Sequence, residues 1–284
     1  MILAIDCGNT HITFGCVQEN GNIEKLFRIP TDRRETDYGY AARMKQIADL
    51  EGIDLSETKG AILSSVVPPV TDTLVRAVRL VTGHTALVVG AGIKTGLHIR
   101  INDPGTVASD LVSTAVSAKE LYPLPCVIID MGTATTLTVV DVGGKYIGGA
   151  ILPGVGISLN TLAENTALLP HIEILPPKNA IAAHTVDSMK SGIVYGTAGA
   201  IDALLDHFAT ELGGAPASIV ATGGMCRMIC PYCRHEITVD ETLLLNGRVS
   251  ASQAEYAGSI PVICSNKNRT FVYRQMFCFS LFKR

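Results

Sequence analysis

Leu3-Ala4-Ile5-Asp6-Cys7-Gly8-Asn9-Thr10 is matched in kind by Val127-Ile128-Ile129-Asp130-Met131-Gly132-Thr133-Ala134-Thr135-Thr136, in which Asp130 follows Asp6 by 124 positions. Each stretch is a short apolar run that ends in Asp, followed after one residue by Gly and small polar side chains. The apolar run predicts a buried strand. A Gly-hydroxyl turn after it lets backbone N–H groups and hydroxyls face an anion. Two such turns predict two facing half-domains that bind the phosphates of a nucleotide.

The similarity between the two halves continues beyond these turns. In each half two extended runs follow, joined by a tight turn. They lie at residues 11–17 and 23–29 around Glu19-Asn20-Gly21-Asn22, and at residues 135–142 and 145–151 around Gly143-Gly144. Gly and Asn tolerate the positive φ that short hairpin loops require. Each half therefore begins with a strand, an Asp turn and a hairpin, the pattern of an internal duplication.

Strands and helices alternate along the rest of the chain, which predicts an α/β protein with mixed sheets. Helices are expected at residues 38–49, 71–81, 110–121, 156–168 and 184–208, and buried strands at residues 60–67, 86–89 and 218–221. Pro68-Pro69 is expected to stop one strand, and Ser109 to cap the helix at residues 110–121. Residues 93–101 are expected to be an irregular, partly extended connection.

The two halves have no linker rich in Pro, Ser or charge between them, so the boundary is expected near Tyr122-Pro123-Leu124-Pro125. This gives an N-terminal domain at residues 1–122 and a C-terminal domain at residues 123–247. Residues 248–284 show no clear periodicity, and we assign them no function.

Composition limits the class of protein. The chain has 284 residues, of which 47% are hydrophobic and 17% charged, so we expect a compact globular protein of two domains. The net charge of -3 argues against a dominant nucleic-acid surface. We expect neither a membrane span nor a signal peptide. Eight cysteines in such a chain indicate reduced thiols of a cytoplasmic protein.

Three carboxylates are candidates for chemistry. Asp6 and Asp130 are either turn residues or part of a site for phosphate and a cation, and their matching contexts favour the site. A carboxylate needs a cation to bind phosphate, so Mg²⁺ or a monovalent ion is implied. Asp110 begins a predicted helix, where the helix dipole favours a carboxylate. It is either that, or a general base for a substrate hydroxyl, as kinases need.

Glycine-rich segments give two further indications. Thr222-Gly223-Gly224 follows a predicted strand, and its glycines permit either close approach of a nucleoside or close packing. Gly90-Ala91-Gly92-Ile93-Lys94-Thr95 lacks the glycine before lysine that a P-loop requires, so we exclude a P-loop.

Cys226, Cys230 and Cys233, with Tyr232 before the last, match the spacing of a three-cysteine iron–sulfur site, or of a zinc site completed by His235. The alternative is three buried thiols on one face of a helix, at positions i, i+4 and i+7. The helical context favours this alternative.

Together these residues resemble the superfamily of acetate kinases, sugar kinases, Hsp70 and actin, and within it the type III pantothenate kinases. The motifs that carry the resemblance are Asp6-Cys7-Gly8-Asn9-Thr10, Ser64-Ser65-Val66-Val67-Pro68, Asp130-Met131-Gly132-Thr133-Ala134-Thr135, Gly148-Gly149-Ala150-Ile151-Leu152-Pro153-Gly154 and Thr222-Gly223-Gly224. The resemblance implies two duplicated ribonuclease H-like (actin-like ATPase) domains with mixed sheets facing a nucleotide cleft. It also implies ATP-dependent phosphorylation of pantothenate on its primary hydroxyl, the first step toward coenzyme A. The expected protein is a homodimer that needs Mg²⁺ and K⁺ or NH₄⁺ and has no nucleic-acid or membrane partner.

The resemblance also implies roles for individual residues. The ATP phosphates would contact Asp6, Cys7, Gly8, Asn9, Thr10, His11, Ile12 and Thr13, and ATP would further contact Thr133, Gly223 and Gly224. Asp130 would bind the monovalent cation and Asp110 would be the general base. Pantothenate would contact Ala108, Ser109, Asp110, Leu111 and Thr185.

The chain departs from the family pattern at the acceptor side. Where the family reads Gly-Ala-Asp-Arg, this chain has Ala108-Ser109-Asp110-Leu111, and Ile101 stands where the family often has Tyr. Loss of the charge-assisted contact of an Arg would cost about 1–3 kcal/mol. An alternative function is therefore that of a catalytically weak nucleotide-binding homologue that acts as a regulator.

Overall fold

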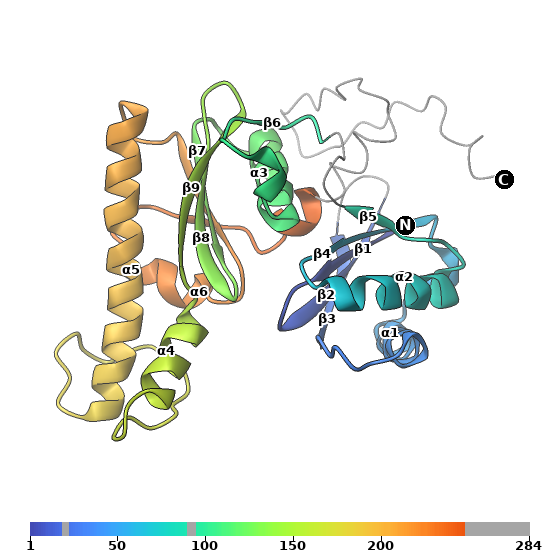
Figure 1. The fold of residues 1–284 in the computed structure, drawn as a ribbon, viewed down its shortest axis with the longest axis horizontal. Coiled ribbons are helices and arrows are strands. Elements are labelled where there is room, and N and C mark those ends of the chain that lie inside the picture. The colour runs from blue at the N-terminus through green and yellow to red at the C-terminus, as the bar shows by residue number, and fades with distance from the viewer. Residues whose placement is uncertain (19–22, 90–94, 248–284) are drawn as a thin grey trace. The chain divides into compact units, whose positions relative to one another are not determined.

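The computed structural model describes residues 1–18, 23–89 and 95–247 and divides the chain into two compact units (Figure 1). The first unit comprises residues 1–96, 105–120 and, at the end of the described chain, 244–247; the second comprises residues 97–104 and 121–243. The expected turn at Glu19-Asn20-Gly21-Asn22, residues 90–94 of the glycine-rich segment before Thr95, and residues 248–284 lie outside the described residues.

Each unit is built from separate stretches of the chain, so the two units are not divided by a single boundary near Tyr122. Residues 97–104 belong to the second unit because β6 (His98–Ile99) pairs with β9 (Lys145–Pro153). Residues 244–247 belong to the first unit because Leu245 is buried among residues of the first sheet.

The first unit contains a five-stranded mixed sheet in the order β3-β2-β1-β4-β5. Its strands are β1 (Ile2–Cys7), β2 (His11–Val17), β3 (Ile23–Pro30), β4 (Gly60–Ser65) and β5 (Leu87–Val89). The pairs β1–β2 and β2–β3 are antiparallel, whereas β1–β4 and β4–β5 are parallel. The strands and the Asp turn predicted at the start of the chain are confirmed.

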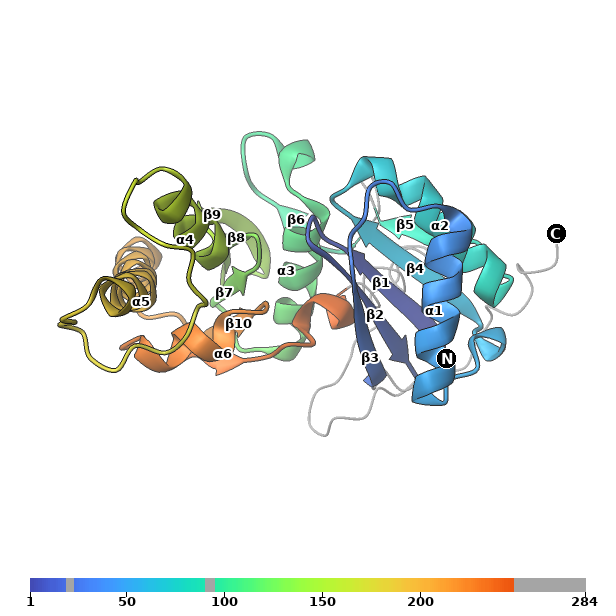
Figure 2. The same ribbon diagram turned by 90° about the horizontal axis from the view of Figure 1, so that it is seen from below.

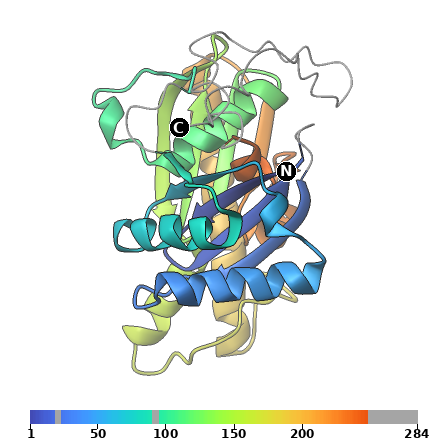
Figure 3. The same ribbon diagram turned by 90° about the vertical axis from the view of Figure 1, so that its right-hand side faces the viewer.

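The first unit includes the helices α1 (Asp37–Glu51), α2 (Pro68–Thr82) and most of α3 (Ser109–Leu121), with short 3-10 turns at η1 (Leu55–Glu57) and, at its border, η2 (Pro104–Thr106). Figures 2 and 3 show α1 and α2 side by side along one face of the sheet. Leu3 and Ile5 of β1 are buried there with Tyr40 of α1 and Leu74 of α2, which removes their apolar surface from water.

Two expectations about helix starts are corrected. Pro68 and Pro69 begin α2, rather than only ending a strand, because the first turn of a helix has no use for the N–H that proline lacks. Ser109 is the first residue of α3, not a cap before it, and its hydroxyl contacts the hydroxyl of Ser64.

The second unit contains a six-stranded mixed sheet in the order β11-β10-β7-β8-β9-β6. Besides β6 and β9, its strands are β7 (Cys126–Met131), β8 (Ala134–Val140), β10 (Ser218–Thr222) and β11 (Thr238–Val239). The pairs β7–β8 and β8–β9 are antiparallel, and β10 is parallel to β7. Gly144, with a φ of 71°, makes the predicted turn between β8 and β9.

The helices of the second unit are α4 (Val155–Glu164), α5 (Thr185–Leu212) and α6 (Cys226–Ile229), followed by the 3-10 turn η3 (Cys230–Tyr232). The long α5 runs along the sheet and packs on β7 and β8 (Figure 1). α4 ends before the predicted residue 168, whereas α5 continues to a left-handed cap at Gly213. Within the described ranges we find no helix with the length and hydropathy that a membrane crossing requires.

The two sheets share one pattern. Read from β9, the second sheet runs β9-β8-β7-β10-β11, and each strand has the same relative direction as its counterpart in β3-β2-β1-β4-β5. In both sheets the strand that leads into an Asp turn therefore lies between an antiparallel and a parallel neighbour.

Candidate active site

The turn after Asp6 is tight and is held from the side by the end of β3. The Gly8 N–H donates to the His11 carbonyl over 3.0 Å. Thr31 donates its backbone N–H to the Thr10 carbonyl over 2.9 Å and its hydroxyl to the Gly8 carbonyl over 2.7 Å. Asn9 and Thr10 are exposed at the tip. The turn is thus a fixed loop that presents Asn9 and Thr10 to solvent.

Asp6 is flanked by hydroxyl side chains on both neighbouring strands. In the strand register, Asp6 lies opposite Thr13 of β2 and opposite Ser64 of β4. Residues directly opposite each other point to the same face of a sheet. The carboxylate and two hydroxyls therefore gather on one face at the end of β1.

Ser64 also connects this edge to α3. It is fully buried, and its Oγ lies 3.0 Å from Oγ of Ser109. The next residue is Asp110, which is half-buried, and one of its carboxylate oxygens accepts the Leu111 N–H over 2.8 Å. The structure thus brings the Asp6 turn and the candidate base Asp110 into one region of the first unit, although they are far apart in the sequence.

The other residues expected on the pantothenate side lie partly in the first unit and partly in the second. Ala108, Ser109 and Leu111 lie at the start of α3 in the first unit, and Leu111 is half-buried. Thr185 is the exposed first residue of α5, and Ile101 lies in the second unit.

The turn after Asp130 is closed in a similar way but is shorter. The Gly132 N–H donates to the Ala134 carbonyl over 3.0 Å. Met131 pairs with Thr135, so this turn spans residues 132–134, whereas Cys7 pairs with Ile12 and the first turn spans residues 8–11. Thr133 is exposed at the tip, where a ligand has access to it.

The backbone at two glycines, Gly223 and Gly154, lies in close contact with this second turn. Gly223 has a φ of 95°, and a Cβ added to it would lie 2.6 Å from the backbone of Met131. A Cβ on Gly154 would overlap the carbonyl oxygen of Thr133. Gly224, by contrast, is exposed and has open space around it. The Thr222-Gly223-Gly224 segment therefore lies beside the Asp130 turn because only glycine permits that approach.

Asp130 is flanked by hydroxyls in the same manner as Asp6. It lies opposite Thr136 of β8 and opposite Thr222 of β10. The Thr136 hydroxyl oxygen is buried and has no hydrogen-bond partner among the described residues. A carboxylate and nearby hydroxyl oxygens are hard donors, so this set fits a cation.

The three cysteines after β10 do not share one helix face. Cys226 begins α6, Cys230 begins η3 and Cys233 follows it. Burial raises the pKa of the Cys230 thiol to about 11 and that of Cys233 to about 12. In the part of the chain that the structure describes, no three His, Cys, Asp or Glu residues are placed to hold a metal ion. In the described residues this segment therefore does not present the three-ligand cluster that the iron–sulfur or zinc hypothesis requires.

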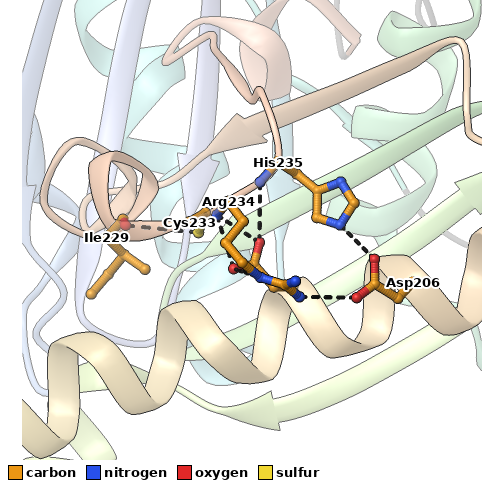
Figure 4. A network of polar contacts seen from close by, with 6 residues as sticks. Asp206, Ile229, Cys233, Arg234 and His235 are labelled. Atoms are coloured by element: carbon orange, nitrogen blue, oxygen red, sulfur yellow. Dashed lines mark hydrogen bonds and ion pairs between the residues drawn. The ribbon is translucent and has the colours of Figure 1, made fainter.

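His235, the fourth candidate ligand, is instead bound to α5. Figure 4 shows the network: His235 Nε2 lies 2.8 Å from Asp206, and the Arg234 N–H donates to both carboxylate oxygens of Asp202, over 3.0 and 2.9 Å. Asp202 is buried, so these donors compensate its loss of water. Asp202 thus fixes the chain after Cys233 to α5.

Several site residues were missed by reasoning from the sequence. Thr31, Ser64 and Thr136 were given no role in the site, whereas Ser109 was expected to contact pantothenate and its contact with Ser64 is the new observation. Ser64 did carry a signal, since it is a hydroxyl residue at the end of the apolar run Ala61-Ile62-Leu63. Thr31 and Thr136 carried none, because their roles depend on strand pairing.

The chain matches one protein family over most of its length. The profile of "Type III pantothenate kinase" matches residues 2–207. Two curated relatives with that name, from Moorella thermoacetica and Brevibacillus brevis, are each 38% identical to this chain. The first alignment covers 87% of this chain and 96% of the Moorella protein, and the second covers the same shares of this chain and the Brevibacillus protein.

Solved structures show the same fold at low sequence identity. The activator of the 2-hydroxyisocaproyl-CoA dehydratase from Clostridium difficile, with bound ADPNP, has a TM-score of 0.54 at 12% identity and covers 91% of this chain and 95% of its own. A glucokinase of the ROK family from Streptomyces griseus, in complex with glucose and AMPPNP, has a TM-score of 0.50 at 15% identity and covers 90% of this chain and 99% of its own. With the α/β fold of actin-like sugar kinases and a family match over most of its residues, the chain belongs to the type III pantothenate kinase family.

Proposed function

We propose that this protein transfers the γ-phosphoryl group of ATP to the primary hydroxyl of pantothenate, giving 4'-phosphopantothenate in the first step of coenzyme A biosynthesis. The observation that carries the proposal is the contact of Ser64 with Ser109, which links the Asp6 strand edge to Asp110. The names of the curated relatives supply the acceptor, pantothenate.

We assign the nucleotide to the two Asp turns and the Gly-Gly segment. The residues from Asp6 to Thr13 hold the phosphates, Thr133 contacts ATP, and Gly223 and Gly224 lie at the adenosine. The close approach of Gly223 to Met131 supports this, because it leaves no side chain over the backbone beside the second turn. Backbone N–H groups and hydroxyls are the usual partners of phosphate oxygens in such turns.

Asp110 is the general base in this proposal. Its carboxylate takes the proton of the pantothenate hydroxyl as the hydroxyl oxygen attacks the γ-phosphorus in line, and ADP leaves. The hydrogen bond from the Leu111 N–H fixes one carboxylate oxygen, which limits rotation of the side chain. Mg²⁺, when bound, neutralises charge on the β- and γ-phosphates.

We assign the monovalent cation, K⁺ or NH₄⁺, to Asp130. The buried Thr136 hydroxyl opposite it supports the assignment, since this oxygen has no hydrogen-bond partner within the described residues. Thr222 on the other neighbouring strand adds a second hydroxyl.

We infer that the two units, the first with residues 1–96, 105–120 and 244–247 and the second with residues 97–104 and 121–243, are duplicated ribonuclease H-like domains. The equivalent order and direction of strands in the two sheets supports the duplication. We also propose that the protein is a cytoplasmic homodimer. The thiol state of the cysteines in the described residues is consistent with a reducing compartment.

A steady-state assay tests the proposal directly. ATP-dependent phosphorylation of pantothenate is measured with K⁺, with NH₄⁺ and with Na⁺ alone. Cation-dependent turnover is the expected result and shows that Leu111 is tolerated in place of the family's Arg. If ATP binds but pantothenate is not phosphorylated, the alternative of a nucleotide-binding regulator takes precedence, because Leu111 removes a cation from the acceptor side.

A further inference from the structure

The loop that follows β3 is held rigidly against the Asp6 turn. Thr31 donates two hydrogen bonds to carbonyls of that turn. One residue later, the Asp32 N–H donates to the Tyr40 hydroxyl over 2.9 Å, and the same hydroxyl donates to the Asp32 carbonyl over 2.7 Å. Tyr40 is fully buried in the core of the first unit. Residues 31 and 32 are therefore fixed both to the turn and to the core.

Arg33 leaves this fixed loop toward the tip of the turn. Its Nη2 donates to Oδ1 of Asn9 over 3.3 Å, and both side chains are exposed. A guanidinium has five N–H donors in a planar fork, so contact with Asn9 uses only part of its capacity. Arg34, the next residue, is held differently: its backbone N–H donates to the Asp32 carboxylate.

We propose that Arg33 binds the terminal phosphate of ATP and supplies positive charge during transfer. Leu111, which stands where the family has Arg, supplies no such charge. The inference rests on the proposed function of the Asp6 turn as the phosphate site. A guanidinium matches the geometry of phosphate oxygens through paired hydrogen bonds. Because Thr31 and Asp32 are anchored before the nucleotide arrives, little ordering of the backbone is needed when Arg33 makes this contact.

The test compares Arg33→Ala with Arg34→Ala in the full-length protein. Each variant removes one exposed positive charge from adjacent positions, but within the described residues Arg33 contacts the turn and Arg34 does not. Affinities for AMPPNP and for ADP are measured by calorimetry with Mg²⁺, after thermal unfolding has shown that both variants are folded. We expect Arg33→Ala to weaken AMPPNP binding about 10- to 100-fold while ADP binding changes little, since ADP lacks the γ-phosphate. Arg34→Ala should change both affinities less than about threefold, as expected for a screened surface charge.

Two outcomes would overturn the proposal. Equal losses of AMPPNP and ADP affinity in Arg33→Ala would mean that Arg33 only supports the turn through Asn9. Equal losses of nucleotide affinity in Arg33→Ala and Arg34→Ala would mean that the positive charge of the loop attracts the nucleotide without a specific contact from Arg33. The binding readout does not depend on pantothenate turnover, so failure of the proposed reaction and failure of this inference are distinguishable.

A kinetic comparison adds a second line of evidence. With the wild type active, Arg33→Ala should lower kcat about 10- to 100-fold, whereas Arg33→Lys should recover part of the loss because it retains the charge without the planar fork. An Arg33→Ala enzyme with unchanged kcat would contradict a role in transfer.

Discussion

Oγ of Ser64, at the end of β4, lies 3.0 Å from Oγ of Ser109, the first residue of α3. Ser64 is paired in register with Asp6, and Ser109 precedes Asp110. The candidate base is therefore the neighbour of a residue that contacts the strand paired with the candidate phosphate turn.

This contact predicts that Ser64→Ala and Ser109→Ala each lower kcat with a smaller effect on the affinity for ATP. Removal of one hydroxyl leaves the other unpaired, which costs about 1–3 kcal/mol for a buried group. The double variant should lose no more than the worse single variant, because both act through one interaction. Steady-state kinetics of the three variants measures this. Ser113→Ala on the same helix is the control, since among the described residues its hydroxyl bonds to the Ser109 carbonyl and not to Ser64; additive losses would contradict the prediction.

Asp110→Asn should reduce kcat by about 10²- to 10⁴-fold, the usual contribution of a general base. The affinity for AMPPNP should stay close to that of the wild type, because the amide keeps the size of the carboxylate. A coupled assay for ADP release and calorimetry provide the two values. Asp72→Asn, an exposed carboxylate of α2, is the control and should retain full activity. Turnover of Asp110→Asn at the wild-type rate would remove the assignment of the base.

Gly223→Ala should be strongly destabilising, whereas Gly224→Ala should not. At position 223 a Cβ meets the Met131 backbone at 2.6 Å and the φ of 95° disfavours any L side chain, while position 224 has open space. We expect a loss of more than about 2 kcal/mol in the free energy of unfolding for Gly223→Ala. Urea denaturation of both variants measures the difference, and equal stabilities would contradict the close approach.

Thr136→Val tests the cation site without a large cost in packing. The two side chains have the same shape, and the Thr136 hydroxyl has no hydrogen-bond partner in the described part of the chain, so the unfolding temperature without added cation should hold or rise. The increase in unfolding temperature caused by K⁺ over Na⁺ should shrink, and more K⁺ should be needed for half-maximal activity. Thr135→Val is the matched control, because Thr135 is also buried and unpaired there but lies opposite Met131, on the other face of the sheet. An identical response of the two variants to K⁺ would exclude Thr136 as a ligand.

The cysteines after β10 should react slowly with thiol reagents at neutral pH. Burial raises the pKa of Cys230 to about 11 and of Cys233 to about 12, from a reference of 9.0, so the thiolate fraction in the folded protein stays very low at pH 7. Because the pKa of each thiol is higher in the folded than in the unfolded protein, the protonated thiols add to the free energy of unfolding below pH 9. This stabilisation is lost as the pH rises from about 9 toward 12. Alkylation rates between pH 7 and pH 10, read by mass spectrometry, measure the shift. Rapid modification at pH 7 would contradict it.

Much of the fold and the identities of the candidate site residues were readable from the sequence, because they depend on local patterns. An apolar run followed by Asp and Gly specifies a strand and a turn within a few residues, and this holds for both Asp6 and Asp130. The start of α2 differs from the expectation, since proline can both end a strand and begin a helix, and α4 ends earlier than its sequence pattern predicts.

The sequence by itself determined the Asp turns, the Gly-Gly segment and the family pattern, since each of these is encoded by residues next to one another. Only the tertiary structure decided which distant side chains meet: Ser64 with Ser109, Thr31 with the Asp6 turn, Thr136 and Thr222 beside Asp130, and Arg33 with Asn9. The physical reason is that strand register and helix docking set these contacts, and both are fixed by burial of apolar side chains across the whole sheet.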